Sequence, residues 1–189
     1  MSRYHHGDLP RQLLAYAAEM AAQTGPESIT LRELARRTGV THAAPTHHFG
    51  TRRGLLTALA TEGFGLLNGA LSRHRGQLHE MGVAYVMWAL DHPGHYAVMW
   101  QPRLLDESSA ELNAVRGRAW ELLSGAVAPC EQTDDAPHAQ VDALAAFAVV
   151  HGLSSIWLSG ALAPPADAAA MTRMITGRLA IIDRDAGLP

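Results

Sequence analysis

Apolar residues along the chain recur at intervals of three and four, and turn-forming residues divide it into helix-sized segments. These turn signals lie at Gly25-Pro26, Gly39, Gly50, Pro93-Gly94, Pro102, Pro129 to Pro137 and Pro164-Pro165. No stretch shows the alternation with period two that a half-buried strand requires. The pattern therefore predicts an all-α protein.

The first helix is expected to begin after Asp8, which is a suitable N-cap, and to end near Gly25. Pro10 is compatible with a first turn, where the backbone N–H has no intrahelical partner. The apolar face of this helix is expected to contain Leu9, Leu13, Tyr16, Ala17 and Met20.

A capping box begins the second helix at Leu31. The Thr30 hydroxyl is expected to accept a hydrogen bond from the Glu33 backbone N–H, and the Glu33 side chain to reach back to the cap. The helix should bury Leu34 and Ala35 and end at Gly39, which suits the left-handed conformation after a helix C-terminus.

Thr41 is predicted to cap a short third helix from His42 to His48, directly after the Gly39 turn. Pro45 is expected to distort the first turn of this segment, and a loop is the alternative. Two short helices joined by a tight glycine turn form either a helix-turn-helix, whose second helix enters the DNA major groove, or a helical hairpin with no role in DNA binding.

The distribution of charge favours the helix-turn-helix. Residues 1–53 contain seven arginines and four acidic residues, whereas the remaining 136 residues contain eight arginines and fourteen acidic residues. A basic N-terminal head on an acidic body indicates that the head meets a polyanion. The chain contains no lysine, so every basic side chain is a guanidinium that can make bidentate contacts with phosphate or guanine.

The segment from Ile29 to Leu56, with the opening residues 4–9, resembles the DNA-binding head of the TetR family of repressors. The resemblance covers about residues 5–60, and the remaining two thirds of the chain is similar only in helical character and length. It implies an all-helical homodimer with a three-helix DNA-binding head at residues 1–52 and a helical effector-binding and dimerisation body at residues 53–189. It also implies a palindromic double-stranded DNA operator and a small molecule that releases the DNA.

Carried over position by position, the resemblance places one group of residues near base edges and another near phosphates. We include Arg32 of the basic head with them, so the predicted DNA-binding residues are Arg32, Thr41, His42, Ala43, Ala44, Thr46, His47, His48 and Arg52. Thr46 replaces the usual aromatic residue, and Gly54 replaces a usual acidic or polar one. The alternative function is therefore a helical protein-interaction module that has lost DNA binding.

Neither a metal nor a cofactor is expected. His47 and His48 are adjacent and diverge on a helix, and His42 lies off the four-residue spacing that aligns two ligands. The sequence also lacks HExxH, P-loop and GxSxG motifs, so an enzyme is not expected. The single cysteine, Cys130, and the absence of a signal peptide are typical of a cytoplasmic protein.

The body is expected to be helical throughout. The predicted helices span Gln77 to Leu90, Pro93 to Trp100, Asp106 to Ala128, 139–163 and a last segment from Asp167. The first of these is apolar nearly all round and must be surrounded by other helices. The residues from Pro129 to Pro137 are expected to form a solvated loop.

The segment 139–163 contains an uncharged run long enough to raise a membrane-spanning interpretation. Its small residues and His151 disfavour that interpretation. The preferred interpretation is a helix buried on two sides, by its own core and by a second subunit. With the last helix, whose stripe includes Met171 and Met174, it would form the homodimer interface.

An effector site is expected among the large soft side chains of the body, although such a stripe also suits an ordinary core. A mostly apolar effector would be oriented by His151 and Tyr96. The candidates are Trp88, Tyr96, Met99, Trp100, Trp120, Phe147, His151 and Trp157.

Overall fold

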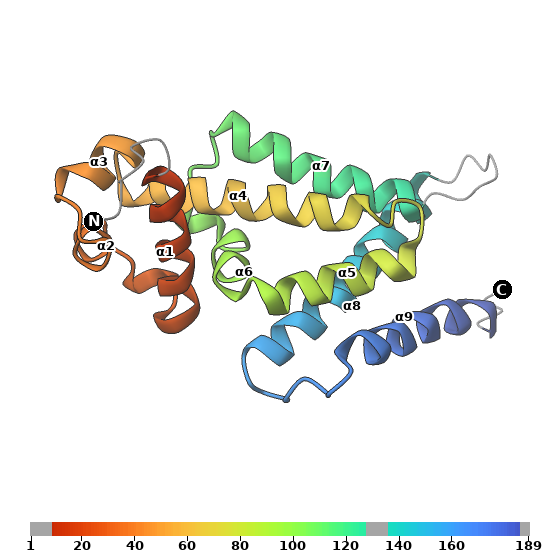
Figure 1. Cartoon of the computed structure of the whole chain (residues 1–189). Helices are drawn as coiled ribbons and strands as arrows, with labels where there is room; N and C mark the ends of the chain where they lie inside the picture. The colour runs from red at the N-terminus through yellow and green to blue at the C-terminus, as the bar shows by residue number, and fades with distance from the viewer. Residues whose placement is uncertain (1–8, 128–135, 186–189) are drawn as a thin grey trace. The chain divides into compact units, whose positions relative to one another are not determined.

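The computed structural model describes residues 9–127 and 136–185, so the predicted Asp8 cap and Cys130 lie outside the described residues. Within them every regular element is helical, which confirms the all-α prediction; Figure 1 follows the helices along the chain. The elements are α1 (Leu9–Thr24), η1 (Pro26–Ser28), α2 (Leu31–Thr38), α3 (Ala43–Phe49), α4 (Arg52–Ser72), α5 (Leu78–Asp91), α6 (Pro93–Met99), η2 (Pro102–Leu104), α7 (Ala110–Val127), α8 (Ala136–Leu158) and α9 (Ala168–Asp185).

The chain divides into two compact units. Unit 1 contains the described residues of 1–65 and 92–116, and unit 2 contains those of 66–91 and 117–189. Unit 1 therefore holds α1, η1, α2, α3, α6 and η2 together with the first parts of α4 and α7. Unit 2 holds α5, α8 and α9 with the last parts of α4 and α7.

The ends of α2 form as the sequence predicts. Thr30 has extended backbone geometry, and its Oγ1 accepts a hydrogen bond from the Glu33 backbone N–H at 3.1 Å. Gly39 follows the last turn with φ of 69°, in the left-handed region. Leu34 and Ala35 are buried. These contacts fix both ends of an eight-residue helix that would not be stable alone.

The start of α3 differs from the prediction. The N-cap residue is His42, and no side chain caps the helix, so the predicted Thr41 cap is wrong. The Thr41 carbonyl instead accepts from the Ala44 N–H at 3.0 Å. Pro45 is buried at the third helical position, where a backbone N–H has no intrahelical partner, and the helix therefore tolerates it. The segment is a helix and not a loop.

The buried face of α1 is Leu13, Ala17, Met20 and Ala21, and α1 packs against α2, α3 and α6 within unit 1. Tyr16 was expected on this face but is exposed, which corrects the prediction. The buried face also includes Ala21. It is therefore rotated about the helix axis by one residue position from the face that the sequence pattern predicts.

A glycine allows α6 to approach the backbone of α1. A Cβ atom added at Gly94 would overlap the Ala18 carbonyl. The same helix is joined to α4 within unit 1 by a hydrogen bond of 3.0 Å between His95 Nε2 and Glu62 Oε2. In unit 1, α6 is therefore in direct contact with both α1 and α4.

We predict that Gly94→Ala lowers the free energy of unfolding by about 1–3 kcal/mol, because the added methyl must displace backbone atoms in a packed contact. Gly65→Ala on α4 is the matched control, since its Cβ would meet open space and the substitution removes a flexible residue from a helix. Urea unfolding of both variants measures the difference. Equal stabilities for the two variants would show that the α1 and α6 backbones are not tightly apposed.

Helix α5 forms the centre of unit 2. It packs against α8 and α9, and its buried residues are Met81, Val83, Tyr85, Val86, Trp88 and Ala89. Gly82 lies in the same interface, where an added Cβ would come within 3.3 Å of Thr176 and Val150. The prediction that this helix is surrounded is confirmed.

Two helices have bounds that differ by several residues from the predicted ones. Helix α7 begins at Ala110 and not at Asp106. The Asp106 carboxylate accepts hydrogen bonds from the backbone N–H of Ser108 at 3.1 Å and from the Ser108 hydroxyl at 2.6 Å. These bonds hold a turn that competes with helix formation. Helix α8 begins at Ala136, inside the predicted loop, of which residues 129–135 lie outside the described residues. It ends at Leu158, before the predicted end at residue 163.

Helix α8 retains a large apolar surface that no other described residue covers. By length and composition its residues 140–158 are sufficient to cross a membrane, yet only 22% of that stretch is buried. One such helix is weak evidence for a membrane span. Among the residues whose burial the structure describes, nine large hydrophobic side chains are exposed. Six of them belong to α8, α9 or the segment between them, namely Val141, Leu144, Ile156, Leu162, Met171 and Met174.

Candidate functional site

Helix α3 presents small and hydrogen-bonding side chains to solvent. Thr41, His42, Ala43, Thr46, His47 and His48 are exposed, and Ala44 is half-buried. Val40 and Phe49 are half-buried at the two ends, while Pro45, between them, is buried. The His47 and His48 rings lie edge to face with centroids 5.2 Å apart. The structure therefore holds the predicted residues of α3 together on one accessible element.

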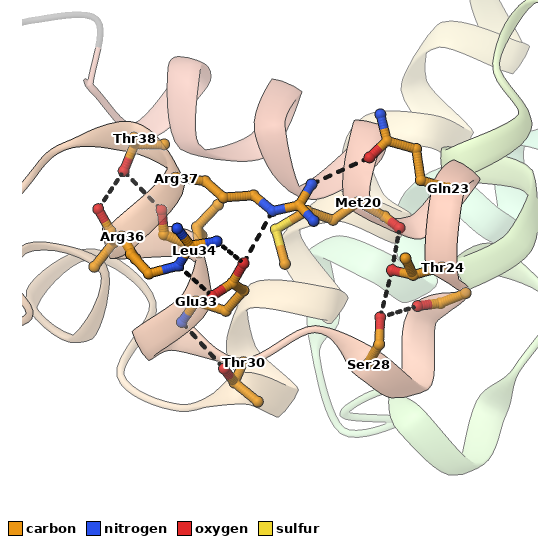
Figure 2. A network of polar contacts seen from close by, with 12 residues as sticks. Met20, Gln23, Thr24, Ser28, Thr30, Glu33, Leu34, Arg36, Arg37 and Thr38 are labelled. Atoms are coloured by element: carbon orange, nitrogen blue, oxygen red, sulfur yellow. Dashed lines mark hydrogen bonds and ion pairs between the residues drawn. The ribbon is translucent and has the colours of Figure 1, made fainter.

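Glu33 organises the arginines of α2. Its carboxylate accepts two hydrogen bonds from Arg36, at 2.8 and 2.7 Å, and one from Arg37 at 3.1 Å. Arg37 also donates to Gln23 of α1 at 3.1 Å, so the network connects α2 to α1 (Figure 2). The prediction that the Glu33 side chain reaches back to the cap is therefore wrong, because the two arginines occupy its oxygens. These bonds lower the pKa of the Glu33 carboxyl to about 2.

An open hollow of about 310 Å³ lies beside this network. Its lining comes from α2, from the cap before it and from the turn into α3, and consists of Thr30, Arg32, Glu33, Arg36, Val40 and His42. Arg32 is exposed and has no hydrogen bond or ion pair with another described residue. Two of the predicted DNA-binding residues, Arg32 and His42, thus share a surface with Arg36, which the sequence reasoning did not single out.

Arg52 has a different environment from the one that the sequence suggested. Its Nε donates to the Ile29 carbonyl and its Nη2 to the Pro26 carbonyl, both at 2.7 Å. Its guanidinium also lies 3.6 Å from Glu27. These contacts join the first turn of α4 to the connection before α2. A sequence pattern does not reveal this role, because the partners are backbone carbonyls more than twenty residues away.

The structure around position 54 explains why a glycine stands there. Thr51 caps α4 by accepting a hydrogen bond from the Gly54 N–H at 3.0 Å, and a Cβ at Gly54 would overlap the Phe49 carbonyl. The departure from the family pattern at Gly54 therefore belongs to the close turn between α3 and α4.

The eight effector candidates divide between the two units. Tyr96, Met99 and Trp100 belong to unit 1, where Tyr96 and Met99 are buried and Trp100 packs edge to face on Phe64 at 5.3 Å. The candidates in unit 2 are Trp88, Trp120, Phe147, His151 and Trp157. Trp88 and Trp157 are buried, whereas Trp120 is exposed.

The structure brings Phe147 and His151 together and adds Tyr85, which the sequence reasoning missed. The Tyr85 hydroxyl is 3.0 Å from His151 Nδ1, and the Phe147 ring stacks on the imidazole with centroids 5.1 Å apart. Tyr85 and Phe147 also meet edge to face at 6.1 Å. Burial lowers the pKa of His151, because the charged imidazolium loses hydration there.

This shift predicts a pH-dependent contribution to the stability of unit 2. The pKa of His151 is lower in the folded chain than in the unfolded chain. The contribution of the neutral imidazole to the free energy of unfolding is therefore complete above the unfolded pKa, near 6.5. It is lost as the pH falls below that value. Unfolding of wild type and His151→Gln should therefore show that the stability advantage of wild type shrinks between about pH 7 and 5. His79→Gln, at an exposed position, should keep the wild-type pH dependence; an identical dependence in His151→Gln would contradict the prediction.

Two family models match the chain. The model for bacterial regulatory proteins of the tetR family covers residues 13–59. The model for the tetracyclin repressor-like C-terminal domain covers residues 78–179. Together they include α2, α3 and most of both units. No curated protein matches the chain.

Solved structures share the fold over nearly the whole chain. A protein of unknown function from Rhodococcus sp. RHA1 has 30% sequence identity and a TM-score of 0.74, with 95% of this chain and 96% of that one covered. A regulatory protein in the tetR family from Rhodococcus RHA1 has 21% identity and a TM-score of 0.67, covering 96% and 95%. NalD from Pseudomonas aeruginosa, the secondary repressor of the MexAB-OprM multidrug efflux pump, has 21% identity and a TM-score of 0.61, covering 91% and 95%.

Proposed function

The chain belongs to the TetR family of bacterial regulatory proteins, and from this premise we propose that it is a homodimeric repressor whose α3 binds a palindromic DNA operator. The observation that carries the proposal is the surface of α3. Seven residues, from Ala43 to Phe49, form a helix immediately after the left-handed turn at Gly39, and its outward side chains are small or hydrogen-bonding. Such a surface can approach base edges in the major groove closely.

The DNA contacts that we propose are those that the family resemblance implies for these positions. Thr41, His42, Ala43 and Ala44 would approach bases, and Thr46, His47 and His48 would contact phosphates and adjoining bases. Arg32 would contact the backbone from α2. For Arg52 we propose a contribution chiefly through the head itself, since two of its N–H groups are bonded to backbone carbonyls.

Dimerisation through α8 and α9 is supported by their exposed apolar side chains. On α8 the positions 141, 144, 148 and 156 follow the spacing of one helix face, and none is charged. Burial of this face by the same face of a second chain would give a two-fold axis, and a palindromic operator would match that axis. The domain division that we propose is a head at residues 1–52 and a body at 53–189, acting in the cytoplasm.

We further propose that a small, mostly apolar effector binds the body and weakens DNA binding. Tyr85, Phe147 and His151 are the best-defined group for orienting it, since they combine two aromatic rings with polar atoms 3.0 Å apart. Helix α4 is continuous from Arg52 to Ser72 and contributes to both units, so we propose it as the element that transmits the change to the head.

The test is recovery of DNA fragments from the encoding genome by the purified protein at several salt concentrations. We expect enrichment of a palindromic sequence with an affinity that falls steeply as salt rises. No enrichment even at low salt would overturn the proposal and favour a protein-interaction module, with Thr46 as the first residue to examine. A screen of small apolar molecules for release of the enriched fragment then tests the effector.

A further inference from the structure

The hollow between α2 and the start of α3 has the composition of an anion site. Of its six lining residues, Arg32 and Arg36 carry guanidinium groups, His42 and Thr30 carry hydrogen-bonding groups, and Glu33 is the one carboxylate. Arg37 is bonded to the same carboxylate. Three arginines against one glutamate leave this region with a net charge of +2 when His42 is neutral.

Glu33 fixes the direction of Arg36. The carboxylate holds Nε and Nη2 of Arg36 in a paired arrangement, with one hydrogen bond to each oxygen. A guanidinium has five N–H donors, so three donors of Arg36 remain that make no bond with the described residues. The Arg36 side chain is nevertheless 69% exposed. The bond to Glu33 thus orients an accessible guanidinium that is still able to bind a second anion.

The shape of the surface distinguishes a phosphate from a base. Phosphate groups project from the DNA backbone, whereas base edges are recessed in the groove. A helix that projects from the protein can reach the base edges. A hollow on the protein can receive a projecting group but cannot reach a recessed one. The observed hollow, of about 310 Å³, has ample room for one phosphate group.

We propose that this hollow is the binding site of one DNA phosphodiester, contacted by Arg36 together with Arg32. In this site Glu33 is a positioning residue that holds the Arg36 guanidinium. The inference rests on the proposed function, which supplies the DNA, and it adds Arg36 and Glu33 to the residues through which the head binds.

The first test is the salt dependence of DNA binding by Arg36→Ala. Loss of one phosphate contact per subunit should reduce the slope of log affinity against log salt by about 0.9 per subunit, or about 1.8 for a dimer. Affinity at about 0.1 M salt should fall at least tenfold. Arg75→Ala, which also removes one exposed arginine, should leave the slope unchanged.

The second test separates positioning from charge. Glu33→Asp keeps the carboxylate but shortens it, so the paired bonds to Arg36 cannot form in the same geometry. We expect a several-fold loss of affinity with an unchanged salt slope, and no further loss when the substitution is made in Arg36→Ala. An equal loss in both backgrounds would show that Glu33 does not act through Arg36.

The possible outcomes distinguish failure of the phosphate site from failure of the proposed function. If the wild-type protein binds DNA and Arg36→Ala keeps the wild-type slope, the phosphate site is wrong and the proposed function stands. If the wild-type protein does not bind DNA, the proposed function fails, and inorganic phosphate becomes the probe. Saturable shifts of arginine Nε–H signals on phosphate titration, absent in Arg36→Ala, would then support an anion site for free phosphate, and no shifts would overturn it.

Discussion

Substitution of Leu144 or Met174 by glutamate is expected to yield a folded monomer that no longer binds the operator tightly. Both side chains are more than half exposed in the single chain, at 57% and 56%. The fold should therefore tolerate the change, whereas a symmetric interface would bring two carboxylates into an apolar contact. Since a monomer contacts one half-site, affinity should fall roughly 10²- to 10⁴-fold through the loss of bivalent binding.

Leu66→Glu is the matched control for this prediction. It places the same charge at an exposed apolar position, 43% accessible, on α4. Sedimentation equilibrium should give a dimer for wild type and Leu66→Glu and a monomer for the α8 and α9 variants, with similar helical circular dichroism for all. Dimers of undiminished operator affinity in the Leu144→Glu and Met174→Glu proteins would exclude this face as the interface.

Ala43→Glu is the second substitution with a large expected effect. Ala43 is exposed at the first position of α3, and a carboxylate there would be repelled by DNA and would occupy space needed for close approach. A disrupted base contact costs about 1–3 kcal/mol, so two half-sites predict a loss of operator affinity between roughly 30-fold and roughly 2 × 10⁴-fold.

Its control is Ala22→Glu, which adds the same charge at an exposed position of α1 in the same unit. Fluorescence anisotropy with labelled operator measures both variants. A uniform, small loss in both would mean that only net charge matters and that α3 does not enter the groove. A large loss confined to Ala43→Glu is the expected result.

Local signals in the sequence predict the head well because they act over a few residues. The Thr30 cap is formed by an atom three residues away, and the Gly39 turn depends on one backbone conformation. The apolar residues on nearly all sides of α5 likewise identify a helix that must be surrounded. These features need no knowledge of tertiary structure.

The side-chain partners are less predictable, because a polar group can have competing local partners or partners that only the fold brings near it. Glu33 binds arginines on its own helix instead of the cap, since a guanidinium offers a charged donor that a backbone N–H does not. Arg52 finds carbonyls that only the fold brings near it. The Tyr85 to His151 contact joins residues 66 positions apart, and composition alone gives no sign of it.

The most direct test of the account is the stoichiometry of binding to the operator. Purified protein should be titrated onto a short duplex containing the enriched palindrome and onto one containing a single half-site, with the mass of each complex measured. Two chains bound together on the full site, and much weaker binding to the half-site, are the predicted result. Equal affinity for full site, half-site and unrelated DNA would contradict recognition of an operator by a dimer.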